Sequence, residues 1–269
     1  SLATSKSAPI LLTKRNEIGK NVFDEIKRLN ANNVIVVGGK VSISEKVVSD
    51  LKDKNITVKR LAGDNRYETS YEIAKELLKS NKAKEAIIVN GFKNVDALSV
   101  SSLATKENLP ILLNDGNRLS KDIKNIVEDS NIKKMYIIGG RTSLPRRIED
   151  NIKALDIEYE RLAGEDRYET SSKIAKYAYE NSDKVILASG ENSIDALAAG
   201  VLTKMEKAPM LLVQKRRIPK SISNRIEESK AKKFLLIGGE KTISDRVKDK
   251  VEGCLLYTSP SPRDGLLSR

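Results

Sequence analysis

Two nearly identical stretches place a cation beside a phenol. Residues 60–70 read RLAGDNRYETS and residues 161–171 read RLAGEDRYETS, with an Arg-Tyr pair where a helix is expected to begin. The dipole of a helix disfavours a cation in its first turn by roughly 0.3–1 kcal/mol. A cation repeated in that place indicates a negative partner, either a carboxylate of the protein or an external anion. The pairs are Arg66 with Tyr67 and Arg167 with Tyr168.

Other charged residues recur in matching positions. Asp96 and Asp195 each precede Ala-Leu near an expected helix start, where capping of the helix is the simpler interpretation. A lysine follows each ILL or MLL run, again close to a helix start: Lys20, Lys121 and Lys220. One alternative to ligand binding pairs Arg66 with Asp96, and Arg167 with Asp195, as bridges between loops. Such bridges would not exclude binding of a ligand by the same loops.

The residue types exclude several kinds of chemistry. The chain has no histidine and a single cysteine, Cys254, so it has no internal disulfide, histidine-based triad or histidine metal site. The GGK, GGR and GGE loops lack the glycine spacing of dinucleotide and phosphate-binding loops, and a tight turn is the expected purpose of these glycines. We therefore expect no catalysis, no metal and no cofactor.

The net charge of +12 favours an anionic partner, although a lysine-rich composition is also typical of AT-rich genomes. The densest basic run is KRR at residues 215–217, which we interpret as a solvated loop. Aromatic residues are only 4% of the chain, so bases have few stacking platforms and nucleic acid is not an expected partner. No apolar run approaches the roughly 18–20 residues that cross a bilayer, so membrane insertion is not expected.

The chain is a repeat of domain-sized copies. The glycine pairs beginning at Gly38, Gly139 and Gly238 lie about 100 residues apart, and the short motifs SLAT, DAL and ILL recur with the same spacing. The spacing predicts copies at 1–58, 59–158 and 159–253. The first copy starts at SLAT and lacks its RLAG and DAL parts, as in a fragment. Residues 254–269 break with the repeat and are interpreted as a non-native or disordered tail.

Each copy alternates short apolar runs with helical patterns. This alternation predicts an α/β fold of parallel strands with helices on both faces. Strands are expected at the ILL runs and at AIIVNG. A helix is expected to carry four apolar residues on one face, namely Ile73, Ala74, Leu77 and Leu78. Asn65 and Asp166 are predicted helix caps, with a glutamate three residues later completing a capping box. Ligands of parallel sheets bind at the carboxyl ends of the strands, which is where the repeated cations are expected.

The combination of RLAGxDRYETS, DAL, PILL and a strand ending in GG, repeated about every 100 residues, resembles the cell wall binding repeat of type 2. These modules occur in clostridial cell wall and S-layer proteins. The resemblance implies three copies around a pseudo-threefold axis. It implies noncovalent anchoring of a secreted protein, exported by an upstream signal peptide, to an anionic secondary wall polysaccharide or teichoic-acid-like polymer.

The resemblance also implies that other domains of the full-length protein carry its activity. The motif of the family covers Arg66, Tyr67 and Glu68 in the second copy and Arg167, Tyr168 and Glu169 in the third. The residues predicted to bind the polymer are Lys20, Arg66, Tyr67, Asp96, Lys121, Arg167, Tyr168, Asp195 and Lys220. An α/β enzyme or binding protein for a phosphorylated small molecule remains the alternative. Binding of nucleic acid through the net positive charge is a third, weaker hypothesis.

Overall fold

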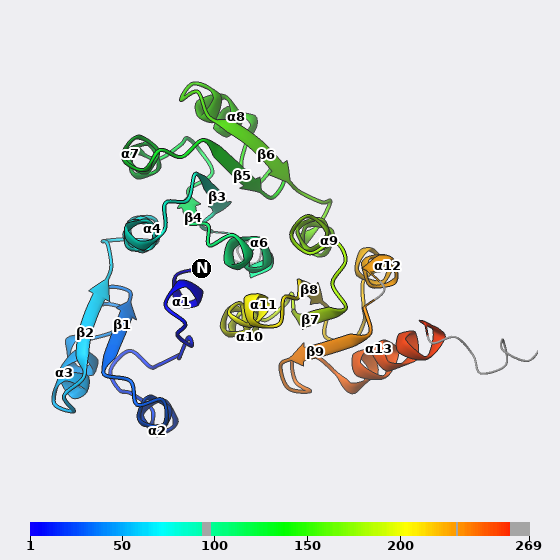
Figure 1. Ribbon diagram of the computed structural model, residues 1–269, viewed down its shortest axis with the longest axis horizontal. Coiled ribbons are helices and arrows are strands. Elements are labelled where there is room, and N and C mark those ends of the chain that lie inside the picture. The colour runs from blue at the N-terminus through cyan, green and yellow to red at the C-terminus, as the bar shows by residue number, and fades with distance from the viewer. Residues whose placement is uncertain (93–97, 230, 259–269) are drawn as a thin grey trace, which may run out of the picture. The chain divides into compact units, whose positions relative to one another are not determined.

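The computed structural model describes residues 1–92, 98–229 and 231–258 (Figure 1). The chain divides into two compact units, of which the first comprises residues 1–93 and 108–161 and the second residues 94–107 and 162–269. Strand β1 pairs with β2, β3 with β4 and β5, and β7 with β8 and β9, all in parallel, for example Ile87 opposite Ile111 and Ile186 opposite Met210. Helices alternate with these strands along the chain, so the predicted α/β class of tandem repeats is confirmed.

The first unit opens with the first copy of the repeat and a two-stranded sheet, β1-β2, whose second strand crosses the predicted 58/59 boundary. Val36, Val48 and Leu51 are central to its core, where helices α2 and α3 cover the sheet. The bounds are α1 Leu2–Ser5, α2 Lys20–Arg28, β1 Asn33–Val37, α3 Glu45–Lys52 and β2 Thr57–Leu61.

One predicted strand of the first copy is not formed. Residues 10–12 (ILL) are irregular, and Leu11 and Leu12 are 37% and 47% exposed. In the other copies the corresponding strand pairs only with the central strand of its sheet, and the first copy contains no counterpart of that central strand. Without a partner the run has no ladder of hydrogen bonds. Lys20 therefore follows an irregular segment, although it still begins α2.

The second copy forms the four-stranded sheet β4-β3-β5-β6, of which β6 crosses the predicted 158/159 boundary. The predicted apolar face of α4 is confirmed but divides between two clusters. Ala74 and Leu78 pack on the core of this sheet, whereas Ile73 and Leu77 pack with Leu2 of α1. The bounds are α4 Arg66–Ser80, β3 Glu85–Asn90, β4 Ile111–Asn114, α7 Lys121–Ser130, β5 Lys134–Ile138, α8 Arg146–Lys153 and β6 Glu158–Leu162.

The second unit contains the three-stranded sheet β8-β7-β9. Helix α6, which belongs to the second copy by sequence, packs here: the Ser102 hydroxyl accepts from the Met210 backbone N–H at 2.8 Å, and Thr105 hydrogen-bonds Thr203. The bounds are α6 Ser101–Lys106, α9 Arg167–Ala178, β7 Lys184–Ser189, α10 Ser193–Ala199, α11 Leu202–Met205, β8 Met210–Val213, α12 Lys220–Ser229, β9 Lys233–Ile237 and α13 Asp245–Thr258.

Each glycine pair makes the predicted tight turn. The φ angles of Gly38, Gly139 and Gly238 are 119°, 96° and 129°, which side chains rarely adopt. Helix α13 continues to Thr258, so residues 254–258 of the segment interpreted as a tail are helical. The copy boundaries at 58/59 and 158/159, and the arrangement around a pseudo-threefold axis, stay predictions.

Candidate functional site

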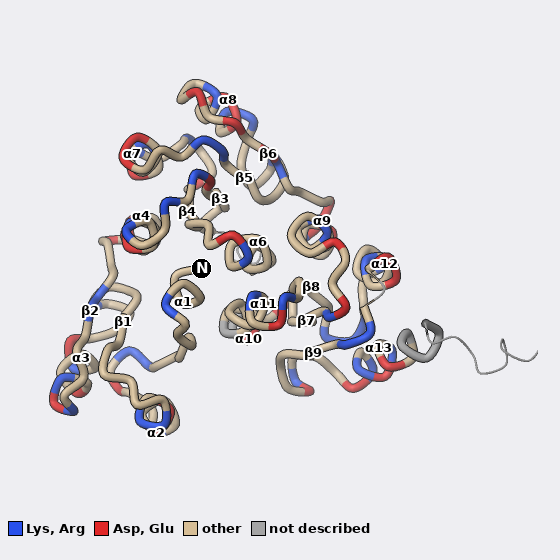
Figure 2. The backbone as a smooth tube through the Cα atoms, in the orientation of Figure 1, with Lys and Arg blue, Asp and Glu red and all other residues tan. Residues whose placement is uncertain are grey.

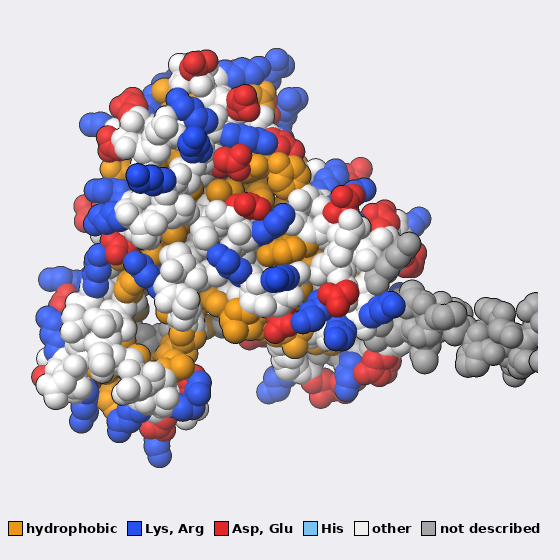
Figure 3. All heavy atoms as spheres, viewed as in Figure 1, with side chains coloured by type: hydrophobic (Ala, Val, Ile, Leu, Met, Phe, Trp, Pro, Cys, Tyr) orange, Lys and Arg blue, Asp and Glu red, His pale blue; other side chains and the backbone are white. Residues whose placement is uncertain are grey.

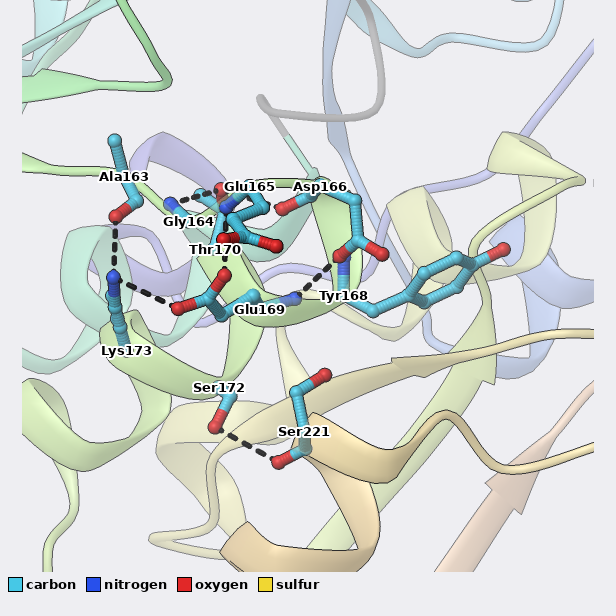
Figure 4. A network of polar contacts seen from close by, with 10 residues as sticks. All are labelled: Ala163, Gly164, Glu165, Asp166, Tyr168, Glu169, Thr170, Ser172, Lys173 and Ser221. Atoms are coloured by element: carbon cyan, nitrogen blue, oxygen red, sulfur yellow. Dashed lines mark hydrogen bonds and ion pairs between the residues drawn. The ribbon is translucent and has the colours of Figure 1, made fainter.

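The helix that opens each RYETS segment is capped as predicted. The Asp166 carboxylate accepts from the backbone N–H groups of Tyr168 and Glu169, both at 2.8 Å (Figure 4). The Glu169 carboxylate reaches one residue further back than a standard capping box and accepts from the Glu165 N–H at 2.7 Å. Asn65 and Glu68 form the same network at the start of α4. The first turn is therefore held rigidly in both copies.

The glycine of RLAG allows the chain to turn tightly into this helix. The Gly164 N–H donates to the Thr170 hydroxyl at 2.9 Å, which in turn donates to the Asp166 carbonyl. A Cβ atom at Gly164 would lie 2.7 Å from both the Glu169 carbonyl carbon and the Thr170 nitrogen. The strand and helix consequently approach more closely than any other residue permits.

The Arg-Tyr pair holds the end of the central strand. Arg66 Nη1 donates to the Gly91 carbonyl and Arg167 Nη1 to the Gly190 carbonyl, each at 2.8 Å. The tyrosine ring packs on the same glycine, since a Cβ at Gly190 would lie 2.7 Å from Cε1 of Tyr168. A backbone carbonyl is thus one negative partner of the first-turn cation.

The proposed bridge from Arg167 to Asp195 is wrong. Within the part of the chain that the structure describes, no carboxylate forms an ion pair with Arg167. Asp195 lies in the first turn of α10 rather than at its cap, and accepts from the Thr242 hydroxyl at 3.3 Å. Asp96 falls outside the described residues, so its pairing with Arg66 is not tested.

The last serine of the motif closes the edge of the sheet. Ser70 and Ser171 accept from the N–H groups of Leu113 and Leu212 at 3.0 and 3.2 Å. These leucines belong to β4 and β8, which lie at sheet edges and so carry N–H groups that face no strand. A serine hydroxyl supplies the acceptor that the sheet lacks there.

The first arginine of the motif ties the GG loop to the strand beside it. Arg161 donates to the carbonyls of Gly139 and Leu144 at 2.6 and 2.9 Å, and its Nε lies 2.7 Å from Oε1 of Glu149. Burial by itself raises the pKa of Glu149, but Arg161, assisted by Arg141, holds the pKa below its ordinary value. Arg60 ties the first GG loop through the carbonyls of Gly38 and Ile43.

The repeated lysines lie where they were predicted, at helix starts. Lys20, Lys121 and Lys220 are the first residues of α2, α7 and α12. All three are exposed, and among the described residues none forms an ion pair. The free N–H groups of a helix N-terminus favour an anion, and these lysines add a charge of the right sign.

The tyrosines are less accessible than the cations. Tyr168 is 7% exposed, and burial raises its pKa, with a further rise from the Glu191 carboxylate. Burial likewise raises the pKa of Tyr67, whose hydroxyl oxygen is buried and has no hydrogen-bond partner among the described residues. Arg66 and Arg167 remain exposed. The side chains at this edge that an external anion reaches are therefore mainly the arginines and lysines.

The structure adds a pocket that sequence reasoning missed. It has a volume of about 340 Å³ at the carboxyl ends of β7 and β8, and the basic loop at residues 215–217 forms one wall. This loop is the blue stretch of tube between β8 and α12 in Figure 2. The signal was the KRR run itself, which was interpreted as a solvated loop. The lining residues are Glu191, Gln214, Lys215, Arg216, Arg217 and Arg246.

Comparison with known proteins places these features in a family. Residues 1–48, 60–149 and 161–248 match the family model described as cell wall binding domain 2 (CWB2). The solved structure of Cwp6 from Clostridium difficile has a TM-score of 0.88 and 32% identity, covering 94% of this chain and 41% of that one. Cwp8 from the same organism has a TM-score of 0.85 and 30% identity, covering 95% of this chain and 44% of that one.

Two curated relatives come from Bacillus subtilis strain 168. The N-acetylmuramoyl-L-alanine amidase LytC is 26% identical over 98% of this chain and 52% of its own length. The amidase enhancer is 30% identical over 93% of this chain and 34% of its own length. The chain thus spans about half or less of these longer proteins. Within the described residues, no helix has both the length and the apolar character to cross a membrane.

Proposed function

The chain belongs to the cell wall binding domain 2 family, and on that premise we propose that it anchors a larger protein to the cell wall by binding an anionic wall polymer noncovalently. The polymer is a polysaccharide or a teichoic-acid-like chain whose phosphates or carboxylates meet the carboxyl edges of the sheets. The polypeptide that carries it acts outside the cell, at the wall or S-layer, after export by a signal peptide. Any catalytic activity belongs to other domains.

The observation that carries this proposal is the exposed lysine at the start of an equivalent helix in every copy. Lys20, Lys121 and Lys220 lie at helix N-termini and form no ion pair within the described chain, although at α7 the Ser120 hydroxyl already accepts from the Ile123 N–H. One exposed contact of this kind contributes roughly 0.2–1 kcal/mol. A repeating polymer that engages several such sites gains affinity from linkage rather than from any single contact.

The arginines of the motif have a double role in this proposal. Arg66 and Arg167 each direct one nitrogen to a backbone carbonyl, while the exposed remainder of the guanidinium contacts the polymer. Tyr67 and Tyr168 position the arginine that precedes each of them, because their rings pack on the glycine whose carbonyl the arginine contacts. Asp195 positions the loop that follows Gly238, because it accepts a hydrogen bond from Thr242. Asp96 is assigned the corresponding role in the second copy by its place in the repeat.

Local charge, rather than total charge, is the basis of this assignment. Basic and acidic side chains lie interspersed over the drawn surface of each unit in Figure 3. A substitution test must therefore separate the position of a lysine from its contribution to the net charge of +12. The chain offers lysines elsewhere on its helices that allow this separation.

We expect the triple variant Lys20→Ala, Lys121→Ala and Lys220→Ala to lose about tenfold in affinity for purified walls, which corresponds to 1.4 kcal/mol. The control variant Lys27→Ala, Lys124→Ala and Lys248→Ala removes the same charge from exposed helix positions and should lose less than about twofold, as expected for screened surface charges. Sedimentation with walls across a salt series measures both. Equal losses in the two variants would contradict the proposed site.

A further inference from the structure

We infer that the third copy carries a pocket for a phosphate-bearing sugar unit, built from the loop after β8 and the start of α13. The inference rests on the proposed function in that the wall polymer would supply this unit. It goes beyond that function because it assigns the third copy a ligand pocket of its own. The observations that carry it are the volume and lining of the pocket, the hydrogen-bonded backbone of its loop and the absence of ion pairs at its cations within the described chain.

The pocket is an open surface depression whose volume is sufficient for a small anion. Its volume of about 340 Å³ falls at the lower end of the range of roughly 300–1,000 Å³ for small-ligand sites. Four of the six lining side chains are cationic, one is an amide and one is a carboxylate. This lining fits a compact anionic group with several acceptor oxygens better than an apolar ligand.

The loop that presents these cations is anchored through the backbone of Lys215. The Lys215 N–H donates to the Glu191 carboxylate at 3.2 Å, and the Lys215 carbonyl accepts from the Ser244 N–H at 2.9 Å. Within the loop, the Gln214 N–H donates to the Arg217 carbonyl at 3.2 Å, and Arg217 Nε donates to the Gln214 side chain. The predicted solvated loop is confirmed, since residues 215–217 are exposed, and hydrogen bonds hold its backbone in addition. A preorganised loop loses little conformational entropy when it binds.

Within the described chain, the cations of the pocket form no ion pairs with carboxylates of the protein. In the described part of the chain, none of Lys215, Arg216, Arg217 and Arg246 forms an ion pair. Glu191, the one acid of the lining, already accepts from the loop backbone. Phosphate carries up to two charges and three acceptor oxygens, and the planar guanidinium binds two of these oxygens at once.

The corresponding loops of the other copies have different charges. In the second copy the positions of Gln214 to Arg217 are occupied by Asp115, Gly116, Asn117 and Arg118. In the first copy they are Lys14, Arg15, Asn16 and Glu17, where Lys14 pairs with Glu17 at 2.5 Å. By contrast, Arg246 corresponds to Arg147 and to Lys46, which are also cationic. The loop after β8 therefore supplies the charge that distinguishes the third copy.

The lining favours a sugar phosphate over nucleic acid. None of its six residues is aromatic, so the pocket offers no platform on which a base could stack. Hydroxyl groups of a sugar match the amide of Gln214 and the carboxylate of Glu191, which both hydrogen-bond readily. RNA is consequently used as a competitor in the test rather than as the expected ligand.

The test compares two double variants with the same loss of charge. Arg216→Gln with Arg246→Gln changes the pocket, whereas Arg118→Gln with Arg147→Gln changes exposed arginines around the corresponding loop of the second copy. We expect affinity for purified walls to fall about tenfold in the first variant and less than about twofold in the second. A tenfold fall corresponds to about 1.4 kcal/mol of binding free energy. Circular dichroism melts verify that both variants fold.

A second arm uses small probes with the whole chain. Glucose 1-phosphate and inorganic phosphate, at constant ionic strength, should shift the NMR signals of the loop after β8 in the wild type and the second-copy variant, but not in the pocket variant. Equivalent shifts with both probes support recognition of the phosphate alone. The inference would be overturned if neither probe gave a saturable shift, or if both double variants lost the same affinity for walls. It would also be overturned if RNA competed for binding as well as a phosphate polymer does. If the wild type fails to bind walls but binds glucose 1-phosphate, the proposed function fails and the pocket stands.

Discussion

Replacement of Arg161 by methionine is expected to lower the free energy of unfolding by about 3–5 kcal/mol, because it leaves a buried carboxylate without its main cation. The Glu149 side chain is 5% exposed and lies 2.7 Å from Arg161 Nε. The carbonyls of Gly139 and Leu144 lose their donor as well. Arg141 stays 3.5 Å from Glu149, but it is 64% exposed and compensates little.

The repeat supplies the control for this prediction. Arg60 also donates to two carbonyls, but its carboxylate partner, Glu45, lies 3.5 Å away and is 55% exposed. Arg60→Met should therefore cost less, because an exposed pair contributes only about 0–1 kcal/mol. Urea unfolding followed by circular dichroism measures both, and Arg161→Met with Glu149→Leu should recover most of the loss. Equal costs for the two arginine variants would show that burial of the carboxylate is irrelevant.

The same pair predicts how stability depends on pH. The pKa of Glu149 is lowered in the folded protein, so its stabilising contribution is present above the unfolded pKa, about 4.3 for glutamate. The contribution is lost as the pH falls from about 4.3 through the lower folded pKa. The stability difference between the wild type and Glu149→Gln should therefore shrink between pH 6 and pH 3 in urea titrations. A difference that stays constant would mean that Glu149 does not titrate in this window.

Replacement of Gly164 by alanine is expected to cost about 2–3 kcal/mol, as overpacking of a tight contact does. The added Cβ would lie 2.7 Å from the carbonyl carbon of Glu169 and from the nitrogen of Thr170. Both atoms belong to the backbone of α9, so no side chain can move aside. The strand would have to separate from the helix, and the network that holds Arg167 would loosen with it.

Gly239→Ala is the matched control for this variant in the same copy. A Cβ at Gly239 would meet no atom within 4 Å, so the substitution should change stability by less than about 0.5 kcal/mol. Thermal unfolding of both variants measures the costs, and wall sedimentation measures binding. Gly164→Ala should also weaken wall binding, through Arg167. Wild-type stability in Gly164→Ala would mean that the turn has more room than the structure gives it.

The sequence by itself determined the repeat, the α/β class and the starts of the two RYETS helices. The spacing of Gly38, Gly139 and Gly238 and the alternation of apolar strands with helices are local or periodic patterns. Caps such as Asn65 and Asp166 act on N–H groups two and three residues away. Interactions over such short separations are encoded in neighbouring residues, so they were predictable without a structure.

Only the tertiary structure decided the partners of the functional side chains. Arg66 and Arg167 were predicted to face an anion, but the carbonyls that they contact lie 25 and 23 residues further along the chain. The ILL run of the first copy matches the pattern of a strand and yet has no partner to pair with. The basic loop at 215–217 became one wall of a pocket when folding brought Glu191 and Arg246 beside it. Such contacts depend on where the ends of parallel strands converge, and the local pattern of residues does not contain that information.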